Sequence, residues 1–266
     1  MKNFQKETYW NERFKKEYSL RGVGDISFDV NFNNILYQIR SFVFKLILKK
    51  LKLENKDIKI LDIGSGTGFY VKHWLELGYK NVVSSDISDV AVENLKKNFS
   101  SIKVIKFDIT EKKLPFDQSE RFDVISVIDV LFHIVDENEY INAIQNISKL
   151  LKPGGYLIAS ENFLTRKVHF QTKHQAFRSK EKILKVFEDN LLFPVLSKPM
   201  FVILYDPING NKWNFFIWHQ IKRIYRFKMY FLLKYCLMPI EKLLIILKKN
   251  GPSTEFYVLK KNEKII

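Results

Sequence analysis

Three glycines that alternate with other residues make the segment 62–68, D-I-G-S-G-T-G, the strongest chemical signal in the chain. The apolar run 58–63 before it predicts a buried strand, and residues 70–77 after it predict a helix. Glycines between a strand and a helix let the backbone approach a ligand closely, because no Cβ atoms intervene. The free N–H groups at the helix start point toward the same ligand. The segment therefore predicts a nucleotide-type binding site.

Further carboxylates follow at the ends of predicted strands, at Asp86, Asp108 and Asp129. Each aspartate alone is a common turn former or helix cap. Ligands of open α/β sheets bind at the carboxyl ends of the strands, however, so the repetition indicates one shared site. Asp86 in particular is suited to accept hydrogen bonds from two ribose hydroxyls with its two oxygens.

The glycine loop departs from two common phosphate-binding patterns. A dinucleotide loop needs glycine at its sixth position, where this chain has Phe69, and a P-loop needs a lysine that is absent here. The loop and Asp86 together favour a ribose-bearing ligand that needs no phosphate cradle. S-adenosylmethionine meets that description.

Five segments in order resemble the class I S-adenosylmethionine-dependent methyltransferases, over roughly residues 58–160. They are ILDIGSGTG, VVSSDIS, FDIT, FDVISVIDVLFHI and LLKPGGYLIAS. The resemblance implies that Asp62 and the glycine loop hold the methionine end of the cofactor. It also implies that Asp86 binds the ribose, that Ile87 packs on the adenine and that Asp108 reaches the adenine amino group. The residues assigned to the cofactor are Tyr9, Asp62, Gly64, Ser65, Gly66, Thr67, Gly68, Asp86, Ile87, Asp108, Ile109 and Asp129.

The assignment of Tyr9 rests on a second likeness. Tyr9-Trp10 followed by Arg13-Phe14 is similar to an N-terminal element of some small-substrate and glycan methyltransferases, in which an aromatic residue covers the cofactor. The alternative is a plain packing helix, because Trp10, Phe14 and Tyr18 lie on one face at helical spacing.

Strands alternate with helices from residue 58 onward, which predicts an α/β, doubly wound, mainly parallel sheet. The resemblance implies a seven-stranded, Rossmann-like methyltransferase fold whose last two strands are antiparallel, and we expect these at Phe201–Tyr205 and Glu255–Leu259. The expected organisation is an N-terminal helical arm or cap at 1–56, an S-adenosylmethionine-binding core at 57–208, a basic aromatic helical insertion at 209–253 and a final core strand at 254–266.

The net charge of +15 lies outside the predicted core. Residues 57–208 are balanced, whereas residues 1–56 and 209–266 carry the basic excess. A basic surface indicates an anionic partner, such as a phosphorylated small molecule, a nucleic acid or an acidic membrane. The alternative to an anionic partner is a basic surface that only keeps the protein in solution.

Several classes of protein are disfavoured by composition. The single cysteine, Cys236, excludes an intramolecular disulfide and fits a reducing cytoplasm, and the polar N-terminus lacks the apolar region of a signal peptide. The apolar stretch 229–247 is interrupted by charges and a proline, so it is a poor membrane span. The histidines form no metal-ligand pair, and no metal is expected. We expect a cytoplasmic protein.

The best candidate for a general base is His133, just beyond the strand that ends near Asp129. Transfer of a methyl group to an oxygen usually requires removal of the oxygen's proton, and the ordinary pKa of histidine suits this role. Alternatives are a packed histidine or a residue that shapes the cofactor site. Asp129 is a second catalytic candidate that could bind substrate or cofactor.

The connection between the last two predicted strands, from about 207 to 253, is too long for a turn and is therefore expected to be functional. We expect a helical cap in which Arg223 and Arg226 meet an anionic group and Trp213 stacks on a ring. Alternatives are a helix that lies on a membrane surface without crossing the membrane, an RNA-binding element, or a pair of helices that only packs on the domain.

The leading hypothesis is O-methylation of a small anionic or carbohydrate acceptor, with surface-glycan (capsule) biosynthesis as a candidate setting. An RNA methyltransferase and a non-catalytic binding module are the alternatives. A DNA partner is not expected, and the sequence leaves the oligomeric state open.

Overall fold

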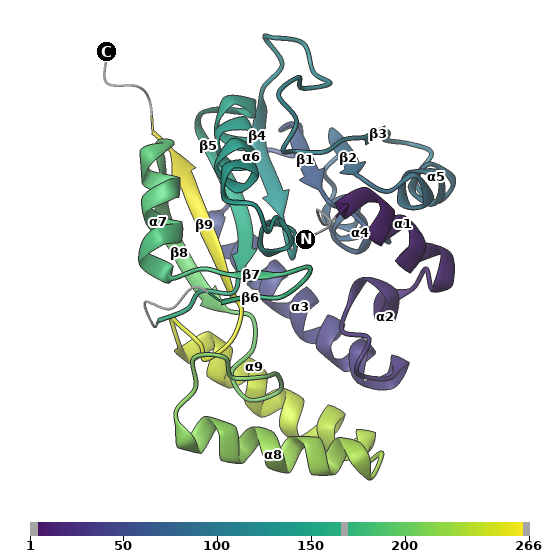
Figure 1. Cartoon of the computed structure of the whole chain (residues 1–266), viewed down its shortest axis with the longest axis vertical. Helices are drawn as coiled ribbons and strands as arrows, with labels where there is room; N and C mark the ends of the chain where they lie inside the picture. Colours follow the sequence, from purple (N-terminus) through teal and green to yellow (C-terminus); the bar gives the residue numbers. More distant parts are fainter. Residues whose placement is uncertain (1–4, 166–169, 263–266) are drawn as a thin grey trace.

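Seven strands form one sheet at the centre of the molecule, in a computed structural model that describes residues 5–165 and 170–262 (Figure 1). Their order across the sheet is β3 (Lys103–Lys106), β2 (Val82–Asp86), β1 (Ile60–Ile63), β4 (Phe122–Val127), β5 (Leu151–Glu161), β9 (Glu255–Lys261) and β8 (Leu192–Pro199). The first five are parallel, and β9 is antiparallel to both of its neighbours. The expected α/β fold class, with its seven-stranded and mainly parallel sheet, is confirmed.

Helices cover both faces of this sheet because alternate strand residues point in opposite directions. Ile60, Val124 and Val258 pack toward α3 (Val30–Leu51) and α4 (Phe69–Glu76). Their chain neighbours Leu61, Ile125 and Leu259 pack toward α6 (Glu137–Leu150) and α7 (Lys180–Asp189). The remaining elements are α1 (Lys6–Lys16), α2 (Leu20–Val23), α5 (Asp89–Asn98), the 3₁₀ turn η1 (Leu131–His133), the small hairpin β6–β7 (Phe170–Gln171, Ala176–Phe177), α8 (Lys212–Arg226), the π-helical η2 (Leu232–Leu237) and α9 (Met238–Leu247).

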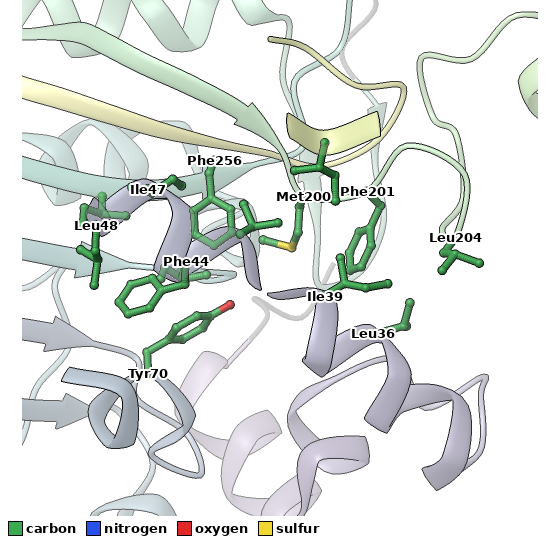
Figure 2. Packing of buried hydrophobic residues seen from close by; sticks show 14 of the residues in the cluster. Leu36, Ile39, Phe44, Ile47, Leu48, Tyr70, Met200, Phe201, Leu204 and Phe256 are labelled. Atoms are coloured by element: carbon green, nitrogen blue, oxygen red, sulfur yellow. The ribbon is translucent and has the colours of Figure 1, made fainter. Parts of the chain in front are cut away.

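The long helix α3 links the sheet to the helices of the late insertion. It begins after Asp29, whose carboxylate caps the helix by accepting a hydrogen bond from the Phe32 N–H at 3.0 Å. Figure 2 shows its buried side chains, Phe44 and Ile39 among them, between Tyr70 on one side and Phe201 on the other. The same cluster contains Trp218 of the insertion, so α3 connects the insertion to the sheet.

Residues Phe201–Tyr205 do not form the strand that the sequence predicts; β8 lies earlier, at Leu192–Pro199. The prediction fails because the backbone N–H groups of Val202 and Ile203 donate to the buried carboxylate of Glu241 in α9, at 2.7 and 2.9 Å, and not to a neighbouring strand. The prolines of β8 are tolerated because β8 lies at the edge of the sheet.

The helices α8 and α9 lie side by side below the sheet (Figure 1) and are held on their inner side. Trp218 and Ile245 are buried in the same cluster as α3. The ammonium group of Lys198 donates to the carbonyls of Ile246 and Lys248 at 2.7 Å each, and so binds the end of α9.

The tight packing beneath the loop after β1 gives a stability prediction. Gly68 and Gly78 both have positive φ, at 81° and 88°, but a Cβ on Gly68 would overlap the Phe99 ring whereas nothing lies near Gly78. We expect Gly78→Ala to cost only the left-handed backbone penalty of about 1–2 kcal/mol. Gly68→Ala should cost about 1–3 kcal/mol more, because Phe99 must move. Urea unfolding of both variants measures the difference, and equal losses would contradict this packing.

Candidate active site

A pocket of about 650 Å³ opens at the carboxyl ends of β1, β2 and β4. Its walls come from the loop after β1, the end of β2, the turn after β4, and the helices α1 and α3. A smaller cavity of about 420 Å³ adjoins it and shares Trp10, Ile87 and His133 with it.

The glycine loop is covered closely by side chains from other parts of the chain. Gly64 and Gly66 have φ values of 70° and 55°, which only glycine adopts at low cost. A Cβ on Gly64 would overlap Val130, and one on Gly66 would lie 2.9 Å from Val23. The loop therefore accepts no side chain at either position.

Asp62 supports this loop from beneath and does not line the pocket. Its carboxylate accepts hydrogen bonds from the hydroxyls of Ser65, at 2.7 Å, and Ser126. Burial raises its pKa to about 6. Direct contact between Asp62 and a ligand, which the resemblance implies, stays a prediction.

Asp86 lines the pocket at the end of β2. Its two carboxylate oxygens accept hydrogen bonds from the N–H groups of Gly66, at 2.8 Å, and Ser88, at 2.9 Å. Burial raises its pKa to about 6. Each oxygen retains a lone pair, so the carboxylate can accept further bonds from a pair of ligand hydroxyls.

The adjoining cavity has the character of a site for a flat ring. Ile87 and Ile109 provide apolar walls, and Asp108 provides a carboxylate. One oxygen of Asp108 accepts from Thr110, and the other lies 3.1 Å from the ammonium group of Lys6 in α1. The helix α1 is therefore tied to the cavity that it covers.

Trp10, and not Tyr9, is the aromatic residue of α1 that lines both cavities. Its ring meets His133 edge to face, with centroids 5.1 Å apart. Tyr9 instead stacks on His174 of the β6–β7 hairpin, at 5.3 Å. Arg13 binds α1 to the following turn by donating to the carbonyl of Gly24 at 2.6 Å.

His133 lines the pocket as a neutral hydrogen-bond acceptor. Its Nδ1 lies 2.8 Å from the backbone carbonyl of His174. A carbonyl only accepts, so the proton is on Nδ1 and the lone pair is on Nε2. Burial lowers the pKa of His133 to about 3, so the ring is uncharged at neutral pH.

Asp129 forms a partly buried ion pair that sequence reasoning missed. Its carboxylate accepts hydrogen bonds from Arg40 of α3 and from the hydroxyl of Ser160, the latter at 2.9 Å. The guanidinium of Arg40 lies over the rings of Tyr37 and Phe201, at 5.3 and 5.2 Å. The available signal was a charged residue directly after Ile39 in the apolar stripe of a predicted helix.

Most residues assigned to the cofactor from the sequence come together here. Gly64, Ser65, Gly66, Thr67, Asp86, Ile87 and Asp129 line the larger cavity, and Asp108 and Ile109 line the smaller one. Tyr9, Asp62 and Gly68 line neither.

The donor set fits S-adenosylmethionine. The hydroxyl of Thr67 is buried at the pocket and has no hydrogen-bond partner among the described residues, so it is available to a ligand carboxylate. The Asp86 carboxylate suits ribose, and the apolar cavity beside Asp108 suits adenine. In the part of the chain that the structure describes, no group of three His, Cys, Asp or Glu side chains could hold a metal ion.

The three residues proposed for substrate binding lie elsewhere. Trp213, Arg223 and Arg226 are on α8, are exposed, and do not line either cavity. The insertion does not cap the pocket in this structure, because Trp218 and Tyr225 of α8 pack on Phe28, just before α3. Contact between these three residues and the acceptor stays a prediction.

Comparison with known proteins agrees with this geometry. Residues 61–159 match the methyltransferase domain family. The tRNA U34 carboxymethyltransferase of Nautilia profundicola is 33% identical over 136 residues, which cover 49% of this chain and 43% of that protein. The ubiquinone biosynthesis O-methyltransferase of Bartonella tribocorum is 29% identical over 136 residues, 47% of this chain and 53% of that protein. The chain thus spans about half the length of these curated relatives.

Two solved structures show the same fold. Magnesium protoporphyrin IX methyltransferase from Synechocystis, with S-adenosylmethionine bound, has a TM-score of 0.58 at 14% identity and covers 96% of this chain and 95% of its own. Phosphoethanolamine N-methyltransferase 2 of Haemonchus contortus has a TM-score of 0.59 at 17% identity, with 96% and 61% covered.

The carboxylate at the end of β2, the glycine loop and the family match lead to one conclusion. Residues 61–159 form a methyltransferase domain, and the chain has the fold of solved S-adenosylmethionine-dependent methyltransferases.

Proposed function

We propose that this protein transfers a methyl group from S-adenosylmethionine to a hydroxyl oxygen of a small, carbohydrate-type acceptor. The observation that carries the proposal is a neutral His133 in the same pocket as Asp86. The carboxylate of Asp129 lines this pocket as well. A hydroxyl acceptor needs both an atom that receives its proton and hydrogen-bond acceptors that orient it.

The bound cofactor supplies a methyl group that its positively charged sulfur already activates. The protein's part is therefore to align the acceptor oxygen with that methyl carbon and to exclude water. Asp86 would hold the ribose of the cofactor, and Thr67 would hold the carboxylate of its methionine portion. Trp10 and Tyr37 close the pocket from α1 and α3.

His133 receives the proton of the acceptor hydroxyl on Nε2. A pKa of about 3 makes the ring a weak base. A weak base suffices here, because an oxygen that gains a carbon while still protonated becomes strongly acidic. When bound, the cofactor would supply the methyl carbon for the new C–O bond and its sulfur would keep the C–S bonding pair, while the acceptor oxygen would keep the O–H pair as its proton passes to His133. The hydrogen bond to His174 keeps the Nδ1 proton in place throughout.

The charges around the pocket favour a hydroxyl-rich acceptor over an anionic one. Lys6 is paired with Asp108, Arg40 with Asp129, and Arg13 donates to backbone carbonyls. No cation among these three is left to bind a phosphate. The proposal extends to capsule or other surface-glycan synthesis, which rests on the likeness of the N-terminal element to glycan methyltransferases.

RNA methylation is the second candidate, and the likeness to a tRNA carboxymethyltransferase favours it. That likeness covers less than half of either chain. The cover that Trp10 and Phe14 of α1 form over the pocket speaks for a smaller acceptor.

Methyl-labelled S-adenosylmethionine distinguishes the candidates. The protein is incubated with separate RNA, protein, lipid and low-molecular-weight carbohydrate fractions, and label is counted in each. Label in the carbohydrate fraction, lost in His133→Ala, is expected. Label in RNA alone would overturn the proposal in favour of the second candidate.

Cofactor binding gives a prediction that does not depend on the acceptor. Asp86→Ala should weaken S-adenosylhomocysteine binding about 10–100-fold, because hydrogen bonds to a charged group are lost at about 1.5–3 kcal/mol. Asp89→Ala is the matched control, since Asp89 is exposed, pairs with Lys106 and does not line the pocket. Isothermal calorimetry measures both. Absence of binding in the unmodified protein would favour a non-catalytic module.

The protonation of His133 is a separate prediction. A histidine with the ordinary pKa of about 6.5 changes its imidazole chemical shifts between pH 5 and 8. Those of His133 should stay constant over this range, as a neutral ring protonated on Nδ1. Nitrogen-15 NMR with selectively labelled histidine makes the measurement, and His133→Gln assigns the signal. A midpoint near 6.5 would exclude the buried, neutral state.

A further inference from the structure

The outer side of the α8–α9 segment carries a concentration of exposed apolar side chains. Trp213, Phe227, Phe231 and Leu247 are 69–73% exposed, and Phe216 and Leu243 are more than half exposed. Elsewhere in the described chain, large apolar residues with this degree of exposure occur only as isolated residues or short pairs. We call these six side chains the apolar surface.

This exposure does not come from a poorly packed insertion. Trp218, Ile221 and Ile245 bury the inner side of the two helices in the core that contains α3. The Tyr225 hydroxyl accepts a hydrogen bond from the Asp29 N–H at 3.2 Å, and the Tyr230 hydroxyl donates to the Asp29 carboxylate. One side of the helices is therefore packed on the core, and the six side chains of the apolar surface are left exposed.

The charge around this surface has one sign. Residues 209–250 contain nine lysines and arginines and a single acidic residue, Glu241. Glu241 is fully buried, and its carboxylate is engaged by the N–H groups of Val202 and Ile203. The exposed charges of the segment are therefore all positive.

We propose that the α8–α9 segment docks on the surface of a bilayer that contains anionic lipids. The apolar surface would enter the boundary between headgroups and acyl chains, and the basic side chains would bind the lipid phosphates. None of the helices in the described ranges is long and apolar enough to cross a bilayer, so the contact is interfacial. This inference does not depend on the acceptor proposed above.

Two other occupants fit the surface less well. A second copy of the chain would bring two basic surfaces together, which electrostatic repulsion disfavours. RNA would satisfy the cations and stack on the aromatic rings, but the exposed Ile240, Leu243 and Leu247 would gain nothing from it. An anionic bilayer accommodates the aliphatic, aromatic and basic groups together.

Co-sedimentation with vesicles tests the proposal on the full chain. Binding is expected to vesicles of phosphatidylcholine with phosphatidylglycerol, and at least tenfold weaker binding to phosphatidylcholine alone. Raising the salt to about 0.5 M should weaken binding, because it shortens the range of the electrostatic attraction. The fluorescence of Trp213 should shift to the blue on binding, and Trp213→Phe should abolish most of that shift.

Two variants locate the contact. Phe227→Ser with Phe231→Ser should lower vesicle affinity at least tenfold while leaving the thermal unfolding midpoint nearly unchanged, because both side chains are exposed. Val195→Ser is the matched control, since Val195 is 52% exposed on β8, outside the apolar surface, and should bind as the unmodified chain does.

Three results would overturn the inference. The first is equal binding to neutral and anionic vesicles, or binding to neither. The second is an unchanged vesicle affinity in the double phenylalanine variant. The third is a protein that does not bind vesicles but self-associates or binds tRNA, and loses that association in the double variant.

Discussion

The pocket depends on the close cover of one loop by side chains from three different places. Val130 from the turn after β4 lies on Gly64, Val23 from α2 lies on Gly66, and Phe99 at the end of α5 lies beneath Gly68. Each contact is short enough to exclude a Cβ atom. The loop can therefore be in its binding conformation only when β4, α2 and α5 are also in place, so the site forms together with the fold.

A single helix then connects this loop to the rest of the molecule. The middle of α3 contributes Tyr37 to the pocket and Arg40 to a partly buried ion pair with Asp129, while its start contacts α8 through Asp29. A buried ion pair contributes little net stability, but loss of one partner is costly because the other charge stays unpaired. The pair therefore acts mainly to fix the position of α3 relative to β4.

The sequence predicts the features that short segments encode by themselves. The strand, glycine loop and helix, the placement of Asp86 and the alternation of strands and helices all follow from local residue types. The strand expected at Phe201–Tyr205 fails because Glu241, far along the chain, satisfies that backbone. The pairing of Arg40 and the placement of α8 away from the pocket depend equally on distant contacts, which local patterns do not contain.

Asp129 has a φ of 60°, in the left-handed region that few residues other than glycine enter easily. Asparagine, aspartate and glycine reach this conformation at the lowest cost. Substitution at this position therefore costs the backbone least when it introduces asparagine or glycine. Asparagine would keep a hydrogen bond to Arg40 without the negative charge, whereas glycine would leave the guanidinium without this partner. The end of β4 therefore tolerates few side chains, whereas the pocket residues of α1 and α3 have ordinary helical backbone and carry no such restriction.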